Sequence, residues 1–279
     1  MGRISTVKEF LMKLPVLFIG HGSPVHAVQD SDYTEEWQNY GDELLDEYDG
    51  EIEAVLCISS QWVSEGAYVT SSAAPPMIGL RNLAGFPPAL YEYRYPAEGS
   101  PDTAERIREL SGGAVRLDPA RGFDYGVWSV LGRMFPDADI PVVQLSLDNR
   151  LNAQGHFDLA KKLIPLRNEG VLVVGSGNIV CNLAAVDWQN PHKEVKPYPW
   201  AELAHELVNK WIIARRYGNL LDEQHYPLAI RQAIGSSPPH FWPLLYVLAM
   251  CGEKEPLELF NDVVVGRAVS MTSLVAGFV

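Results

Sequence analysis

The stretch PVLFIGHGSPVH, Pro15 to His26, places a histidine between two glycines directly after a short apolar run. Val16 to Ile19 have the pattern of a short buried strand. The two glycines and the Ser23-Pro24 pair then indicate a turn. His21 is therefore expected at the end of a strand, which is where ligands bind in open α/β sheets. The alternative is a polar turn histidine that binds nothing.

Other short apolar runs recur along the chain, with helical patterns between them. Strands are expected at 16–19, 54–60, 67–72, 141–147, 170–177 and 261–266, and helices at 35–48, 100–110, 156–170 and 201–218. This alternation predicts an α/β fold in which helices flank a largely parallel central sheet. The strands are apolar throughout, so both faces of the sheet should be covered. No linker or repeat interrupts the pattern, and we expect a single domain over residues 1–279.

The composition excludes several classes of protein. The net charge is −13, which argues against binding to nucleic acid or to an anionic membrane surface. The three cysteines are far apart and form neither a disulfide framework nor a zinc finger. Lys13 interrupts the N-terminal apolar stretch, and no apolar run is long enough to span a bilayer. A cytoplasmic protein in a reducing compartment is expected.

Polar side chains follow several of the predicted strands. Gln61 ends the second strand, Asn178 and Cys181 follow the strand at 171–174, and His240 opens an apolar helix. These residues could converge with His21 on one edge of the sheet. Each also has a structural alternative, such as a strand cap for Gln61 or a small buried side chain for Cys181. The GSGN sequence lacks both dinucleotide and Walker spacing, and no G-x-S-x-G elbow is present.

Longer motifs extend the pattern over nearly the whole chain. They are GHGSP (20–24), GFPPALYEYRYPAEGSP (85–101), GFDYG (122–126), PDADIPVVQLSLD (136–148), SGNIVCNL (176–183), YPWA (198–201) and PPHFWPLLYVL (238–248). On these motifs the chain resembles the class III extradiol ring-cleavage dioxygenases of the DOPA-dioxygenase type.

The resemblance implies a metal site and a pair of reactants. The family holds a single non-haem Fe(II), sometimes replaced by Zn(II), and uses it to bring a catechol and O₂ together. The product is an opened ring that bears an aldehyde and a carboxylate. By this resemblance His21 and His240 are metal ligands. We predict that Ser23 and Asn178, within the motifs, and Tyr91 and Tyr93, on the aromatic loop at 75–101, bind the substrate.

The sequence departs from the family at three histidine positions. Gln61 stands where the family has a metal-binding histidine, Tyr125 replaces the histidine of GFDHG, and Cys181 replaces the proton-transfer histidine. An amide oxygen is a weaker ligand than imidazole, so Gln61 is predicted to complete or border the metal site. Cys181 and Tyr125 are the candidate catalytic residues: a thiol with an ordinary pKa of about 8.5 could transfer protons, whereas a tyrosine with a pKa of about 10 is a poor base at neutral pH. His26 is an alternative source of a third ligand.

The sequence thus predicts a metal-dependent, aromatic ring-opening dioxygenase-like oxidoreductase with a partly substituted active site. Its predicted partners are a small catecholic or other aromatic compound and O₂. The alternative is a non-catalytic homologue that binds a small aromatic ligand, or a partner, without cleaving a ring. A metal-independent hydrolase that uses Cys181 is a third possibility, but no histidine stands at a partnering position in the sequence.

Overall fold

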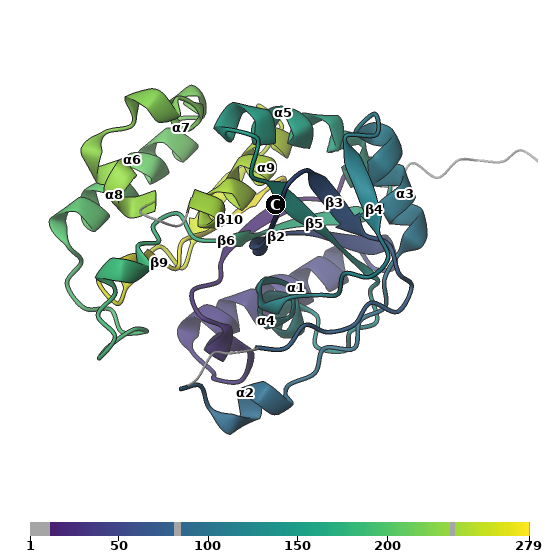
Figure 1. The fold of residues 1–279 in the computed structure, drawn as a ribbon, viewed down its shortest axis with the longest axis horizontal. Coiled ribbons are helices and arrows are strands. Elements are labelled where there is room, and N and C mark those ends of the chain that lie inside the picture. The colour runs from purple at the N-terminus through teal and green to yellow at the C-terminus, as the bar shows by residue number, and fades with distance from the viewer. Residues whose placement is uncertain (1–11, 81–84, 235–237, 279) are drawn as a thin grey trace, which may run out of the picture.

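The computed structural model describes residues 12–80, 85–234 and 238–278, and its centre is an eight-stranded sheet (Figure 1). The order of the strands across the sheet is β4-β3-β5-β2-β6-β1-β10-β7. Their bounds are β1 Val16–Gly20, β2 Ala54–Ser64, β3 Ala67–Thr70, β4 Val115–Asp118, β5 Val142–Asp148, β6 Val171–Gly177, β7 Leu257–Phe260 and β10 Ser273–Ala276. Two further strands, β8 Val264–Val265 and β9 Val269–Ser270, pair with each other outside this sheet.

The centre of the sheet is parallel, the edge strand β4 pairs in parallel with β3, and antiparallel pairings occur between β3 and β5 and at the β1-β10-β7 margin. Strand β2 pairs in parallel with both β5 and β6, and β6 pairs in parallel with β1. The pairings of β1 with β10, of β10 with β7 and of β3 with β5 are antiparallel. The carboxyl ends of β1, β2 and β6 therefore lie side by side at one edge, which is the usual place for a ligand site in such sheets.

Helices cover both faces of the sheet. Helices α1, α2 and α4 lie on one side, whereas α5, α6, α7 and α9 lie on the other (Figure 1). The α-helices are α1 Asp32–Glu47, α2 Pro88–Glu92, α3 Pro101–Leu110, α4 Tyr125–Met134, α5 Ala153–Lys162, α6 Pro199–Ile213, α7 Gly218–Leu221, α8 Leu228–Ile234 and α9 Trp242–Met250. Short 3₁₀ helices are η1 Pro24–Ala27, η2 Ile164–Asn168, η3 Leu183–Ala185, η4 Glu223–His225 and η5 Pro238–His240.

Alternation along the central strands builds two apolar cores. On β1, Val16 and Phe18 pack into the core on the α9 side, while Leu17 and Ile19 pack into the core on the α4 side. All four side chains are fully buried. Burial on both faces explains why the central strands are continuous apolar runs in the sequence.

The predicted fold class is confirmed, since helices flank a largely parallel central sheet. The extent of the single domain, 1–279, stays a prediction because residues 1–11 and 279 lie outside the described ones. The run at 261–266 supplies only the two-residue strand β8, and the sequence pattern gave no indication of β10 and β7 at the antiparallel margin. Among the described residues, no helix combines the length and apolar character needed to cross a membrane.

Candidate metal and substrate site

His21 directly follows β1, and its backbone N–H donates to the carbonyl of Gly177 on β6 at 3.0 Å. The side chain is fully buried, and its Nδ1 lies 2.9 Å from Oγ of Ser176. The Ser176 hydroxyl donates its only hydrogen to the carbonyl oxygen of Gly126 at 2.6 Å. Ser176 must therefore accept a hydrogen from Nδ1, which places the lone pair of the imidazole on Nε2.

His21 Nε2 is a buried nitrogen without a hydrogen-bond partner in the described part of the chain. Buried polar atoms in native structures almost always have a partner, so this lone pair points to a missing ligand. Burial, together with His240 and His26 nearby, holds the pKa of His21 well below its usual value. The ring is therefore neutral at pH 7, the form that binds metal ions.

His240 ends η5 and presents its ring in the same way. Its Nδ1 lies 3.2 Å from Oδ1 of Asn178, and the Asn178 amide nitrogen donates to the carbonyl of Ser270 at 2.9 Å. This arrangement makes Asn178 Oδ1 the acceptor, so Nδ1 carries the hydrogen and Nε2 the lone pair. Burial lowers the pKa of His240 to about 4.

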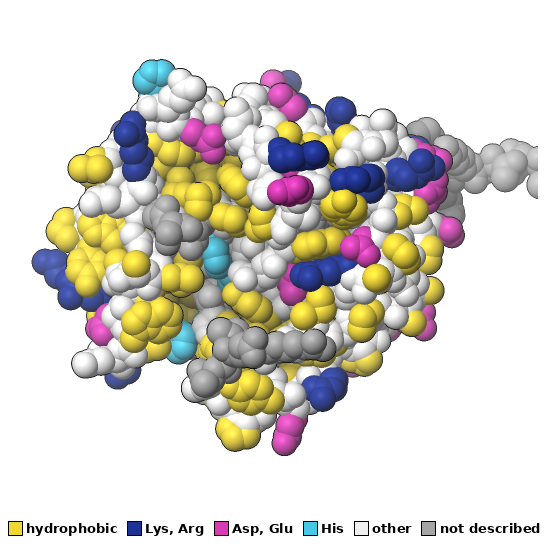
Figure 2. Space-filling model, viewed as in Figure 1, with side chains coloured by type: hydrophobic (Ala, Val, Ile, Leu, Met, Phe, Trp, Pro, Cys, Tyr) yellow, Lys and Arg dark blue, Asp and Glu magenta, His cyan; other side chains and the backbone are white. Residues whose placement is uncertain are grey.

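The two rings are close enough to share one ion. The centres of the His21 and His240 rings lie 5.4 Å apart, with an angle of 64° between the planes. Two imidazoles bound to one ion at the usual metal–nitrogen distance place their ring centres about 5 Å apart. In the view of Figure 2, histidine side chains show within a hollow bordered largely by apolar and uncharged side chains. The donor set thus fits the metal that the family resemblance implies.

Two glycines on β6 allow His240 to reach this position. A Cβ on Gly177 would lie 2.2 Å from the carbonyl oxygen of His240, and one on Gly175 would lie 2.8 Å from that of Pro243. The backbone N–H of Asn178 donates to the same His240 carbonyl at 2.8 Å. The glycines of the GSGN sequence therefore permit close backbone approach to η5 and α9.

Gln61 lies within β2, between Ile58 and Val63, where the pairing of the strand with β5 is interrupted. Its Nε2 donates to Oγ of Ser60 at 2.8 Å, and the side chain lies near the hydroxyl of Tyr125. The Tyr125 ring in turn meets the His21 ring edge-on at 6.0 Å. Oε1 of Gln61 accepts no hydrogen bond from the described residues. This oxygen is the atom that Gln61 can offer to a metal.

The ligand set remains short of three strong donors. No group of three His, Cys, Asp or Glu side chains suited to a metal ion gathers anywhere in residues 12–80, 85–234 or 238–278. Two imidazoles and one neutral amide oxygen form a weaker set than three imidazoles. The arrangement therefore fits a divalent metal, with reduced affinity.

Cys181 and Tyr125 lie close enough to interact electrostatically, but both are held in their neutral forms. Burial raises the pKa of the Cys181 thiol to about 12. Burial, followed by the charges of Asp124 and Cys181, raises the pKa of Tyr125 well above its usual value. Each side chain can donate a hydrogen bond at pH 7, and neither can act as an efficient base there.

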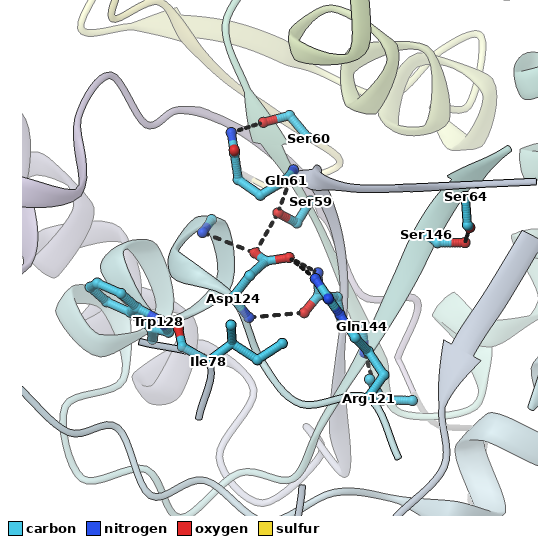
Figure 3. Close-up of polar contacts among 12 residues, drawn as sticks. Ser59, Ser60, Gln61, Ser64, Ile78, Arg121, Asp124, Trp128, Gln144 and Ser146 are labelled. Atoms are coloured by element: carbon cyan, nitrogen blue, oxygen red, sulfur yellow. Dashed lines mark hydrogen bonds and ion pairs between the residues drawn. The ribbon is translucent and has the colours of Figure 1, made fainter. Parts of the chain in front are cut away.

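A buried carboxylate, Asp124, fixes the start of α4 and the end of β2 (Figure 3). Its Oδ1 accepts hydrogen bonds from Oγ of Ser59 at 2.7 Å and from the N–H of Gly126 at 3.1 Å. Its Oδ2 accepts from the amide of Gln144 and from the guanidinium of Arg121 at 3.2 Å. Gly126 is the residue whose carbonyl holds Ser176, so the carboxylate supports the orientation of His21 through the backbone.

The predicted substrate-binding residues lie in different surroundings. Ser23 accepts a hydrogen bond from the N–H of Val25 at 3.4 Å and caps η1. Tyr93 packs 5.6 Å from the Trp128 ring on α4, and Tyr91 is 43 % exposed on α2. Asn178 orients His240, as described above. Contact of these four side chains with a substrate stays a prediction, and residues 81–84 of the loop lie outside the described ones.

Sequence reasoning missed two residues that orient the site, Asp124 and Ser176. The sequence could have indicated a structural role for Asp124, because an aspartate before an apolar helical run is a common N-cap. For Ser176 the indication is weaker. A hydroxyl in the last positions of a buried strand needs a hydrogen-bond partner near the strand end. Neither sequence pattern indicates which residue of the site Asp124 or Ser176 helps to orient.

Comparison with known proteins gives a consistent result. The family model described as the catalytic LigB subunit of aromatic ring-opening dioxygenase matches residues 15–277. A 4,5-DOPA dioxygenase extradiol of Escherichia coli K12 is 39 % identical over 97 % of this chain and 98 % of its own length. The corresponding protein of Beta vulgaris is 31 % identical, with 94 % of each chain covered.

A solved structure matches as well. The crystal structure of an uncharacterized protein from Escherichia coli K12 superposes with a TM-score of 0.76 at 35 % sequence identity. The match covers 94 % of this chain and 99 % of the other.

Proposed function

The chain belongs to the LigB family of aromatic ring-opening dioxygenases, and from this premise we propose that it opens the ring of a small catechol with O₂. The observation that carries the proposal is the pair of neutral imidazoles, His21 and His240. The Nε2 atom of each has no hydrogen-bond partner among the described residues. DOPA is the first substrate to test, because relatives at 39 % and 31 % identity are DOPA dioxygenases. Fe(II) is the proposed metal.

The chain's own residues would hold the reactants and limit proton movement. Bound iron would bind catechol and O₂ together and pass electron density between them. His21 and His240 would hold the metal, with Oε1 of Gln61 as the third protein atom. Both oxygen atoms of O₂ enter the product, which carries an aldehyde and a carboxylate at the opened bond.

Proton transfer is the weak step in this site. A catechol must lose protons as it reacts, and a positioned acid or base contributes about 10²- to 10⁴-fold to such a step. Tyr125 and Cys181 both keep their protons at pH 7, because burial raises the pKa of each. We therefore propose slow ring opening. The same observation favours the second candidate, a homologue that binds a catechol without cleaving it.

The test combines metal content with oxygen uptake. Metal-free protein is loaded with Fe(II) without oxygen, and DOPA or catechol is then added with air while O₂ and the yellow product are followed. We expect about one iron per chain and slow uptake. His240→Ala should abolish both, whereas the exposed His225→Ala, whose partner is Asp222, should change neither.

Each other outcome has a defined meaning. If iron binding is the same in wild type and in His240→Ala, the His21–His240 site is wrong. If iron and catechol both bind but no oxygen is consumed, the protein is the non-catalytic homologue.

A further inference from the structure

A second pair of histidines, His26 and His192, repeats the geometry of the first. Their ring centres lie 5.5 Å apart at an interplanar angle of 71°, against 5.4 Å and 64° for His21 and His240. His26 is only 4 % exposed, and His192 is half-buried. The separation is again the one expected when two imidazoles share an ion, about 5 Å.

The rest of the fold holds both histidines in place. His26 lies in η1, and its carbonyl accepts a hydrogen bond from Nε of Arg133 on α4 at 2.7 Å. His192 lies on the loop between β6 and α6, which is fastened to the β8–β9 turn. There the N–H of Gly266 donates to the carbonyl of Lys193 at 3.0 Å. The ring pair is therefore built by segments far apart in the sequence.

The nitrogens of these two rings have no hydrogen-bond partner among the residues that the structure describes. A sulfur atom lies beside them. A Cβ placed on Gly22 would lie 3.3 Å from Nε2 of His26 and 2.7 Å from Sδ of Met271. Gly22 has φ +60°, a conformation suited to glycine, and because it lacks a side chain both the imidazole nitrogen and the thioether sulfur can lie close beside it.

We propose that His26, His192 and Met271 form a second metal site, separate from the His21–His240 pair, whose ion is Cu(I). Thioether and imidazole are soft and borderline donors, and a thioether selects Cu(I) over harder ions. The site does not depend on the proposed ring opening.

The charges around the pair agree with a monovalent ion. Burial, followed by His192 and Arg133, lowers the pKa of His26 to about 4, so its ring is neutral at pH 7. Burial also lowers the pKa of His192. The Arg133 guanidinium forms an ion pair with Asp30 at 2.8 Å, which offsets part of its charge. Glu194, the closest acid along the loop, accepts a hydrogen bond from Tyr33 at 2.7 Å.

The experiment measures Cu(I) binding without oxygen, by competition with the chromophoric chelator bicinchoninate. The His21→Ala/His240→Ala double variant is the background, because it leaves the second site as the only proposed one. We expect this variant to bind about one Cu(I) per chain. His192→Gln in this background should weaken Cu(I) binding at least about tenfold. Met271→Leu should do the same while leaving Zn(II) affinity unchanged.

Controls separate loss of the site from loss of the fold. His225→Gln changes an exposed histidine and should leave Cu(I) binding intact. If the background variant does not fold, wild type is titrated against His192→Gln alone, and one equivalent of Cu(I) should be lost. Cu(I) binding that is absent from the folded background, or unchanged by His192→Gln, overturns the proposal. Catechol turnover has no part in any of these measurements, so failure here leaves the ring-opening proposal to its own test.

Discussion

Replacing Ser176 with alanine tests how the chain orients His21, the first proposed metal-binding histidine. The Ser176 hydroxyl accepts from Nδ1 of His21 at 2.9 Å and donates to the carbonyl of Gly126 at 2.6 Å. Alanine removes both contacts from a fully buried position. The Nδ1–H and the carbonyl are then left without partners, and the imidazole is free to move its hydrogen to Nε2.

The magnitude follows from those two contacts. A buried polar group left without a partner costs about 1–3 kcal/mol, so the two groups together should lower the free energy of unfolding by about 2–6 kcal/mol. Loss of the group that orients a metal-binding histidine typically costs about 10- to 100-fold in metal affinity. Calorimetric titration with Zn(II) and urea unfolding measure the two effects separately.

A matched control is Ser146→Ala on β5. Ser146 is also fully buried and accepts two hydrogen bonds, from Oγ of Ser64 and from the N–H of Tyr68, each at 2.8 Å. Its loss should lower stability to a similar degree and leave Zn(II) affinity unchanged. If both variants lose affinity equally, the effect is global. If Ser176→Ala keeps full affinity, the tautomer assignment of His21 is wrong.

Three further predictions concern the pH dependence of stability, the oxygen uptake of Gln61 and Cys181 variants, and the N-cap of α4. Burial lowers the pKa of His156 to about 4. Between pH 4 and the ordinary histidine pKa near 6.5, His156 therefore carries a proton in the unfolded chain but not in the folded one. Stability should therefore fall on acidification through this window, and His156→Phe should reduce the slope of unfolding free energy against pH by up to about 1.4 kcal/mol per pH unit; an unchanged slope would contradict the assignment. Gln61→His should raise iron occupancy, and Gln61→His/Cys181→His should raise oxygen uptake by more than the product of the single effects; brisk wild-type turnover of DOPA would show that the present residues suffice. Asp124→Ala removes an N-cap and the acceptor for Arg121 and should lower the melting temperature by about 5–10 °C, as seen by calorimetry, from a loss of about 2–4 kcal/mol; an unchanged melting temperature would refute the buried network.

The central strands β1, β2, β3, β5 and β6 and the helices α1, α3, α5, α6 and α9 could be predicted, because they depend on local patterns. Apolar runs buried on both faces predict parallel strands, and glycine and proline mark their ends. The antiparallel margin formed by β7 and β10 could not be predicted, because partner choice among strands depends on contacts between distant segments. The second strand also runs on to Ser64, beyond the predicted end at residue 60, because its pairing with β5 resumes at Val63 after an irregularity.

For the site, the sequence by itself placed His21 and Asn178 directly after buried strands, whereas Gln61, which was expected to end a strand, lies within β2. Through the family resemblance the sequence also predicts that Gln61, Tyr125 and Cys181 occupy positions where the family has histidine. Residue identity at a strand end is local information, and parallel strands bring such ends to one edge of the sheet.

Only the tertiary structure decided the chemical state of these groups. The Nε2 lone pair of His21 follows from Ser176 and Gly126, and that of His240 follows from Asn178 and Ser270. The raised pKa of Cys181 comes from burial, and the pairing of His26 with His192 comes from two segments that meet only in the folded chain. Tautomer, pKa and ligand geometry depend on neighbours in space, and those neighbours come from distant parts of the chain.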